Sequence, residues 1–145
     1  MESMAIKQHK KVIISVTNDL VSDQRVHKVA TSLMKFNYDV LLVGRKLIES
    51  LPVNRYYKTK RMRLIFRRSA LFYAAYNFRL FCLLLFRKVD ILLSNDLDTL
   101  PANYMISKLR NKTLIYDSHE YFTEVPELIS RPRTRSFWLK LEKFM

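Results

Sequence analysis

Short runs of apolar residues along the chain predict buried β-strands. In a strand covered by helices on both faces, neighbouring residues are all apolar, whereas a strand with one wet face alternates. Runs of the first kind lie at residues 11–17, 38–43, 90–94 and 112–116. Gly44 is expected to end the second of them. A further strand is expected near residues 62–66, after a polar stretch at 46–60.

Between these strands, apolar residues recur at intervals of three and four, which places them on one face of a helix. Residues 22–36 form the first such segment, and Asp19 or Ser22 is available to cap it. A second helix is expected after residues 95–99, through Leu109. The predicted buried faces are Val26, Val29, Ala30 and Leu33 in the first helix, Ala102, Met105, Ile106 and Leu109 in the second, and Phe137, Trp138, Leu141 and Phe144 in a third.

Residues 70–86 are almost all apolar or aromatic, and only Asn77 and Arg79 interrupt the run. Its length approaches the roughly 18 to 20 residues of a membrane span. A charge in the middle of a span is costly, and a strand pattern follows immediately, so we expect a buried helix that crosses between two strands. A helix lying at a membrane interface is the alternative.

Strands that alternate with helices predict an α/β fold: a Rossmann-like doubly wound parallel sheet with helices on both faces. The first strand, the first helix and the second strand fit within the roughly 30 residues that a right-handed parallel crossover needs. Such sheets bind ligands in the crevice beyond the carboxyl ends of their strands. The polar residues that follow each strand are therefore the candidates for a site.

The composition limits the chemistry of that site. Gly44 is the only glycine and Cys82 the only cysteine, which excludes a glycine-rich phosphate loop and an intramolecular disulfide. No pair of histidines has metal-ligand spacing with Cys82, so no metal is expected. The lone thiol and the lack of an evident signal peptide favour the cytoplasm.

The net charge favours an anionic partner. Lys and Arg number 26 against 13 Asp and Glu, which gives a formal charge of +13. Nucleic acid, an acidic lipid surface and phosphorylated substrates all fit this charge. The basic residues cluster at 58–68, at Arg79, Arg87 and Lys88, and at 131–135. A solvated surface is the alternative for each cluster.

Ionisable and amide side chains follow three of the predicted strands. They are Asn18, Asp19, Asp23 and Arg25 after the first strand, Asn95, Asp96 and Asp98 after the fourth, and Asp117, His119 and Glu120 after the fifth. The carboxyl ends of parallel strands emerge at one edge of the sheet, so these side chains are expected to converge on one pocket.

Three runs at these positions resemble the N-terminal domain of family 4 glycosyltransferases, in particular a bacterial branch that builds surface polysaccharides. The runs are Asp23, Gln24, Arg25 and Val26 with Lys28 and Ala30; Asn95, Asp96, Leu97, Asp98, Thr99 and Leu100; and Tyr116, Asp117, Ser118, His119, Glu120, Tyr121, Phe122, Thr123 and Glu124. The resemblance covers nearly the whole chain from Lys11 onward. It implies one half of a two-domain GT-B fold and a retaining transfer of sugar from a nucleotide sugar to an acceptor, in polysaccharide or glycolipid synthesis.

The resemblance also implies roles for single residues. His119 matches the family's histidine that lies against the donor hexose, which makes it the candidate catalytic residue; capping of the next segment is its alternative role. The substrate-binding residues implied are Asp19, Arg25, Asn95, Asp96, Asp117 and Glu120. For Asp96 the alternative role is to cap the helix that follows it. For Asp117 the alternative role is to orient His119 or a backbone turn. For Arg25 the alternative to contact with a phosphate of the ligand is a structural salt bridge with Asp23 or Asp96.

These implications give an expected organisation. Residues 1–10 are expected to be a flexible N-terminus and residues 11–145 the N-terminal, acceptor-side domain, cut before a C-terminal domain that binds the donor. No cofactor is expected beside the nucleotide sugar, which is a substrate. Without the second domain, the chain is expected to be inactive or nearly so.

The expected partners are the nucleotide sugar, a sugar or lipid-linked acceptor, the missing C-terminal domain and an anionic membrane surface. The protein is then cytoplasmic, with peripheral attachment to the inner face of the membrane as a further expectation. A basic nucleic-acid-binding module and a non-catalytic Rossmann-like interaction domain are the alternatives. No helix-turn-helix, zinc or RNA-recognition signature supports the first, so nucleic acid is not expected as a partner.

Overall fold

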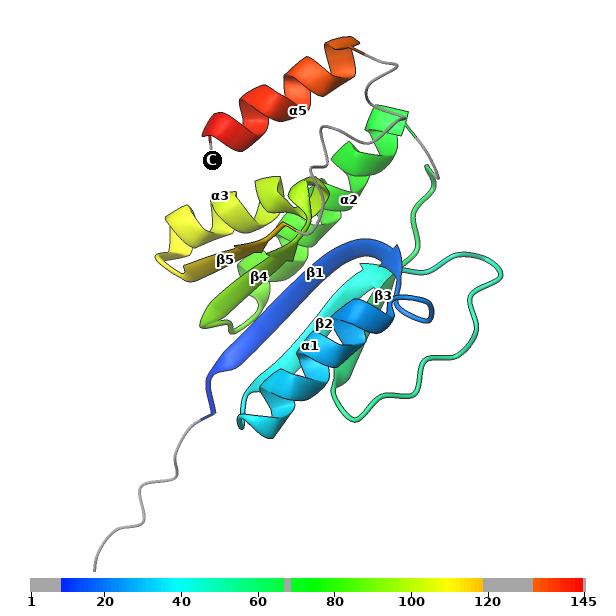
Figure 1. Ribbon diagram of the computed structural model, residues 1–145, viewed down its shortest axis with the longest axis vertical. Helices are drawn as coiled ribbons and strands as arrows, with labels where there is room; N and C mark the ends of the chain where they lie inside the picture. The colour runs from blue at the N-terminus through cyan, green and yellow to red at the C-terminus, as the bar shows by residue number, and fades with distance from the viewer. Residues whose placement is uncertain (1–8, 67–68, 119–131, 145) are drawn as a thin grey trace, which may run out of the picture.

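A parallel sheet forms the centre of the molecule. The computed structural model describes residues 9–66, 69–118 and 132–144. The five strands are β1 (Lys11–Asp19), β2 (Asp39–Arg45), β3 (Lys58–Met62), β4 (Ile91–Asn95) and β5 (Thr113–Asp117). They lie in the order β3-β2-β1-β4-β5, and every neighbouring pair is parallel (Figure 1).

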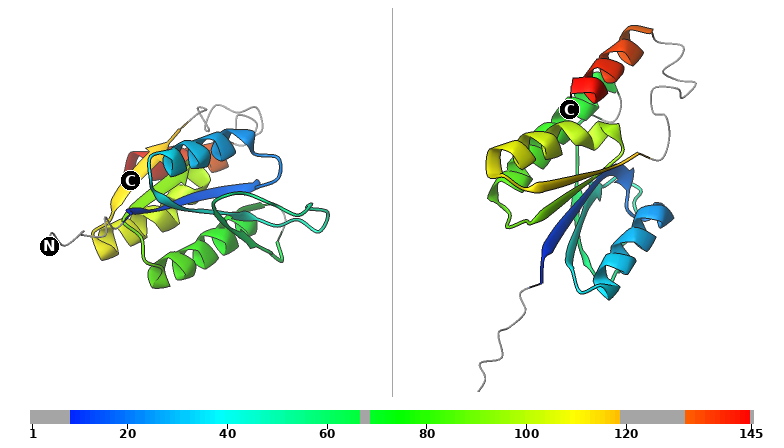
Figure 2. Two further views of the ribbon diagram at one scale, coloured as in Figure 1. Left: turned by 90° about the horizontal axis from the view of Figure 1, so that it is seen from below. Right: turned by 60° about the vertical axis from the view of Figure 1, so that its left-hand side comes forward.

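Helices cover both faces of this sheet. They are α1 (Gln24–Lys35), α2 (Ser69–Phe86), α3 (Leu100–Arg110) and α5 (Pro132–Phe144), with a short 3-10 turn η1 (Leu97–Thr99) before α3. α1 packs on one face through Val26 and Ala30. α2 and α3 pack on the other through Tyr76, Leu80 and Ile106 (Figure 2). The predicted α/β fold, a Rossmann-like doubly wound parallel sheet, is confirmed.

The chain changes its direction across the sheet between β1 and β4, which are neighbours. After β1 the chain crosses to α1 on one face, and after β4 it crosses to η1 and α3 on the other face. At such a switch point the two connections diverge and leave a crevice beyond the carboxyl ends of the strands. This crevice is the place to look for a ligand site.

Gly44 lies inside β2, so the expectation that it ends this strand is wrong. β2 continues to Arg45. A Cβ atom at Gly44 would lie 2.9 Å from the carbonyl oxygen of Asn18 and 2.4 Å from Cδ2 of Leu20. The end of β1 thus passes so close to β2 that no larger residue fits. The need for glycine here comes from close packing, which the sequence pattern does not reveal.

The third strand occupies Lys58–Met62 and not residues 62–66 as expected. β3 is an edge strand, and Met62 is its only fully buried side chain. Lys58 and Lys60 are exposed on it, as is common where lysines keep an edge from pairing with other chains. The search for an apolar run therefore missed a strand that needs little apolar surface.

The helix faces also need correction. Asp23 caps α1, because its carboxylate accepts the Val26 N–H at 3.1 Å, so neither Asp19 nor Ser22 is the cap. In α3 the predicted Met105 and Leu109 are 56% and 64% exposed. The polar residues Asn103 and Ser107 are buried there in their place. Their side chains donate hydrogen bonds to the carbonyl oxygens of Thr99 and Tyr104, which makes their burial tolerable.

The predicted apolar face of α5 is also only partly buried. Trp138 is 6% exposed and meets the Tyr73 ring edge-on, with ring centroids 5.6 Å apart. Phe137 and Phe144 are 59% and 78% exposed. The side chain of Leu141 lies outside the described residues. One aromatic residue thus anchors this helix beside the start of α2.

α2 is buried along one stripe only. Phe72, Tyr76, Leu80 and Leu84, four residues apart, face the sheet. The opposite side is exposed, although it is also apolar. By length and composition α2 could cross a membrane, and 22% of it is buried within the protein. The expected crossover helix is therefore present, but it is buried on one side only.

Candidate functional site

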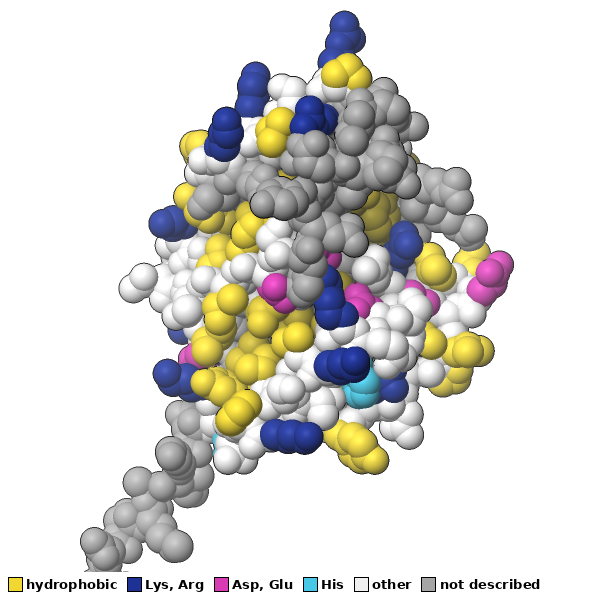
Figure 3. Space-filling view, in the orientation of Figure 1, with side chains coloured by type: hydrophobic (Ala, Val, Ile, Leu, Met, Phe, Trp, Pro, Cys, Tyr) yellow, Lys and Arg dark blue, Asp and Glu magenta, His cyan; other side chains and the backbone are white. Residues whose placement is uncertain are grey.

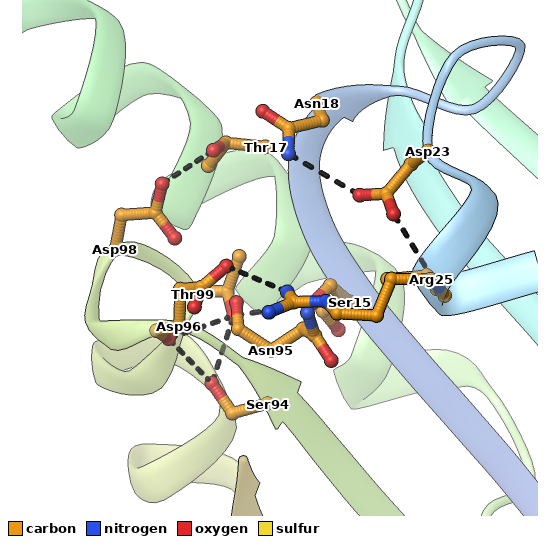
Figure 4. A network of polar contacts seen from close by, with 11 residues as sticks. Ser15, Thr17, Asn18, Asp23, Arg25, Ser94, Asn95, Asp96, Asp98 and Thr99 are labelled. Atoms are coloured by element: carbon orange, nitrogen blue, oxygen red, sulfur yellow. Dashed lines mark hydrogen bonds and ion pairs between the residues drawn. The ribbon is translucent and has the colours of Figure 1, made fainter. Parts of the chain in front are cut away.

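Arg25 and Asp96 meet in the crevice between β1 and β4. Arg25 lies in the first turn of α1, and Asp96 directly follows β4. The Arg25 Nη2 atom is 3.2 Å from Oδ2 of Asp96, and the side chains are 37% and 29% exposed (Figure 4). A partly exposed pair of this kind contributes at most about 1 kcal/mol to folding. Its donor and acceptor remain accessible to a ligand that can both donate and accept hydrogen bonds.

The backbone of Asp96 is strained. Its φ of 67° and ψ of 164° lie in a region that is almost restricted to glycine and that costs other residues about 1 to 3 kcal/mol. The side chain does not cap η1, so the capping alternative is not observed. The Asp96 N–H donates instead to the carbonyl oxygen of Asp117 at 3.1 Å. In this backbone conformation the Asp96 carboxylate pairs with Arg25.

The free energy of unfolding of Asp96→Gly is expected to exceed that of Asp96→Ala by about 1 kcal/mol, because glycine adopts this backbone conformation without strain. Both variants lose the ion pair with Arg25, so their difference isolates the backbone. Urea denaturation of the two variants measures it. At an ordinary position glycine is the less stable of the two by about 0.5 to 1 kcal/mol, and that order would contradict the strain.

Asp98 is a buried acid beside this pair. It is 6% exposed and accepts a hydrogen bond from the Thr17 hydroxyl. Burial raises the pKa of Asp98 from 3.8 to about 7, the negative charge of Asp96 adds to the rise, and the Thr17 bond opposes it. The carboxyl group is therefore partly protonated near neutral pH.

Asn95, the last residue of β4, is 1% exposed. Among the described residues, neither its amide nitrogen nor its amide oxygen has a hydrogen-bond partner. Further unpaired buried oxygens in the described part of the chain are Ser15 Oγ, Asp98 Oδ1 and Asn103 Oδ1. An unpaired buried polar group costs about 1 to 3 kcal/mol. A side chain that is kept at this cost at a switch point is well suited to bind a ligand.

Asn95→Leu is expected to raise the free energy of unfolding by about 1 to 2 kcal/mol, because it removes two unpaired polar atoms and keeps the volume. The matched control is Asn77→Leu, whose amide is fully paired and whose loss should destabilise the protein by a similar amount. Urea denaturation measures both. Loss of stability in Asn95→Leu would show that its amide is paired after all.

Asn77 joins α2 to the segment that carries the site. Its Nδ2 atom donates to the carbonyl oxygens of Tyr73 and Asp98, at 3.0 and 2.7 Å. Its Oδ1 atom accepts the Ala102 N–H at 3.1 Å. One side chain therefore holds both η1 and the first turn of α3 against α2.

The other predicted site residues are placed as follows. Asp19 ends β1 on the side of β2 and β3: its carboxylate accepts from the Ser50 hydroxyl and lies 3.9 Å from Nη1 of Arg61. Asp117 ends β5, and the register places it beside Asn95. His119 and Glu120 lie outside the described residues. The structure thus brings Arg25, Asn95, Asp96 and Asp117 to neighbouring strand ends, while Asp19 holds the loop after β2.

The sequence prediction placed Asp98 among the polar residues after the fourth strand, but it gave Asp98 no role, because nothing in its spacing distinguished it from Asp96. Thr17 was missing from the prediction. Thr17 lies within β1, directly after its last buried residue, Val16, and no spacing along the chain marks it as a site residue. Both are recognised only when β1 and η1 are placed side by side.

Acidic and basic side chains gather in the middle of the face that carries α1 (Figure 3). Among the described residues, no group of three or more His, Cys, Asp or Glu is placed to hold a metal ion. The chemistry of the described site is thus that of carboxylate, amide and guanidinium groups. Such groups suit a ligand with several hydroxyl or phosphate oxygens.

The fold and the switch-point crevice define an α/β domain of the Rossmann-like class. No protein family and no curated protein matches the sequence. Two crystal structures of the C-terminal domain of PF1911 hydrogenase from Pyrococcus furiosus are similar, each with a TM-score of 0.54. Their sequences are 11% and 14% identical to this one. The matches cover 75% and 76% of this chain and 91% of each hydrogenase chain. At this identity the likeness shows the fold alone.

Proposed function

We propose that this chain is the N-terminal, acceptor-side domain of a retaining glycosyltransferase of the GT-B type, family 4. One observation carries the proposal. The first of the three runs that resemble this family caps and begins α1, the helix that follows β1. The second run starts at the last residue of β4, and the described part of the third run, residues 116–118, lies at the end of β5. β1, β4 and β5 are adjacent in the sheet. Residues far apart in sequence are thereby gathered at one edge, where a doubly wound sheet binds its ligand.

In this proposal the site binds an acceptor hydroxyl and the phosphate side of a nucleotide sugar. Asp96 accepts a hydrogen bond from the acceptor hydroxyl, and Arg25 exchanges its ion pair for a phosphate oxygen. Asn95 supplies the amide that the folded chain leaves unpaired. The bond from the anomeric carbon to the phosphate oxygen breaks as the acceptor oxygen bonds to the same face, and the acceptor proton passes to the departing phosphate.

His119 completes the proposed site through its hydrogen bond to the sugar. In the complete protein, His119→Ala is expected to lower turnover by about tenfold or more, because a hydrogen bond made in the transition state is lost. Initial rates with a panel of nucleotide sugars and a lipid-linked acceptor measure the effect. Unchanged secondary structure by circular dichroism and an unchanged midpoint in urea control for folding. Turnover like that of the wild type would remove His119 from the mechanism.

The donor side of the reaction is assigned to a second Rossmann-like domain, with which this domain forms the cleft. The product of the complete reading frame is therefore expected to transfer sugar, and this chain alone is expected not to. The pair of assays uses the same donors and acceptors. Absence of transfer by the complete protein with every nucleotide sugar would reject the proposed function.

A further inference from the structure

The outward side of α2 is apolar along the whole helix. Leu71, Phe78 and Phe86 on this side are 57%, 69% and 86% exposed. Apolar residues recur there at intervals of three and four: Leu71, Ala74, Ala75, Phe78, Cys82 and Phe86, which we call the α2 outer face. α2 lies on the outside of its layer, and no described element lies beyond it (Figure 2, left). An exposed apolar surface of this extent marks an interaction site.

Basic side chains border the α2 outer face. Arg79 lies on the flank of the helix toward β3, where its guanidinium donates to the carbonyl oxygen of Arg63. Arg87 and Lys88 directly follow the helix and are exposed, as is Lys60 on β3. α2 contains no acidic residue. The surface therefore combines an apolar centre with a positively charged border.

We propose that the α2 outer face docks on an anionic lipid bilayer, with α2 lying in the plane of the membrane. The apolar side chains enter the boundary between headgroups and acyl chains, and the basic border meets the lipid phosphates. The helix does not span the bilayer, because Tyr76 on its inner side is fully buried and donates a hydrogen bond to the Val16 carbonyl oxygen. This inference goes beyond the proposed function, since it holds whether or not the chain transfers sugar.

A bilayer fits this surface better than a protein does. The α2 outer face offers no hydrogen-bonding side chain other than the Cys82 thiol, whereas protein interfaces carry a hydrogen bond for about every 100 to 200 Å². A bilayer requires only apolar side chains and nearby positive charge. A second copy of this chain would bring the same basic border against itself, at a net charge of +13 on each copy. Repulsion between like charges disfavours that arrangement.

Co-sedimentation of the complete chain with lipid vesicles tests the proposal. Binding is expected to vesicles of phosphatidylcholine mixed with phosphatidylglycerol, and to be weaker by about tenfold or more with phosphatidylcholine alone. Added salt should weaken the first binding, because it screens the basic border. Equal binding to both vesicles, or to neither, would overturn the proposal.

Two pairs of variants locate the contact. Phe78→Glu should weaken binding to anionic vesicles by about tenfold or more, because it places a charge in the apolar centre. The control Phe36→Glu alters a phenylalanine that is 76% exposed beside α1, on the opposite face of the sheet, and should have a much smaller effect. The second pair consists of double variants with the same change in charge. Arg87→Glu with Lys88→Glu, next to the α2 outer face, should weaken binding far more than Lys28→Glu with Lys35→Glu on α1. Equal effects within either pair would reject the α2 outer face as the contact.

Cys82, the only cysteine, gives an independent readout on this face. An environment-sensitive fluorophore on Cys82 should shift to the blue when anionic vesicles are added. A fluorophore on Phe36→Cys, in a Cys82→Ser background, should not. Sedimentation velocity without vesicles tests whether a second copy of the chain covers this face instead. If the protein is a dimer that Phe78→Glu dissociates, and vesicles cause no blue shift, the face belongs to a second copy.

Discussion

The free energy of unfolding is expected to fall as the pH rises from about 4 to about 7, because the folded protein keeps a proton on Asp98 that the unfolded chain has released. Burial raises the pKa of this carboxyl from 3.8 to about 7. The stabilising contribution is fully present below the unfolded pKa and is lost once the pH passes the folded pKa. Each pH unit in the window is worth about 1.4 kcal/mol, so the whole effect is about 4 kcal/mol.

Asp98→Asn isolates this effect, because an amide of nearly the same shape does not titrate. Urea denaturation at several pH values gives the difference in unfolding free energy between wild type and variant, and this difference should slope across the window. Other carboxylates contribute equally to both proteins and cancel. Glu49→Gln, at an exposed carboxylate, is the control and should give parallel curves. Parallel curves for Asp98→Asn would mean that Asp98 is charged in the folded protein.

Tyr76→Ala is expected to lower the free energy of unfolding by about 3 to 5 kcal/mol, the cost of removing a large buried ring and leaving a cavity. Tyr76 is fully buried at the centre of the interface between α2 and the sheet. Its hydroxyl donates to the carbonyl oxygen of Val16 in β1 and lies 3.5 Å from that of Val43 in β2. The ring and the hydroxyl both attach α2 to the sheet.

Tyr76→Phe separates the two contributions. It keeps the ring but leaves the carbonyl oxygen of Val16 without this donor, which should cost about 1 to 3 kcal/mol. Tyr56→Ala removes a tyrosine that is 96% exposed and should change stability by less than about 0.5 kcal/mol. Urea denaturation at one pH ranks the three variants. A loss in Tyr76→Ala no larger than that in Tyr56→Ala would contradict the central position of this residue.

Much of the fold could be predicted from the sequence, because each inner strand needs a run of apolar residues. β1, β2 and β4 lie inside the sheet, and their runs were located to within two residues of each end. β3 was misplaced because an edge strand is stabilised by its backbone pairing with β2 and carries lysines. The face of α3 was misread because Asn103 is buried with its side chain bonded to the local backbone. A search for apolar residues cannot detect polar side chains that are buried in this way.

The site could be predicted only as far as its position. The rule for parallel sheets brought Arg25 and Asp96 to one edge, and the structure places them 3.2 Å apart. Their roles in binding remain predictions. The strained backbone of Asp96, the unpaired amide of Asn95 and the raised pKa of Asp98 depend on what surrounds each group in three dimensions. No spacing of residues along the chain contains that information.

The three hydrogen bonds of Asn77 have a mechanical consequence. Because one amide grips both the 3-10 turn and the start of α3, sliding or rolling of α2 over the sheet must carry the turn with it or break these bonds. The turn begins directly after Asp96. A movement of α2 against the sheet is therefore expected to displace the Asp96 carboxylate as well, because the Asn77 side chain couples the two.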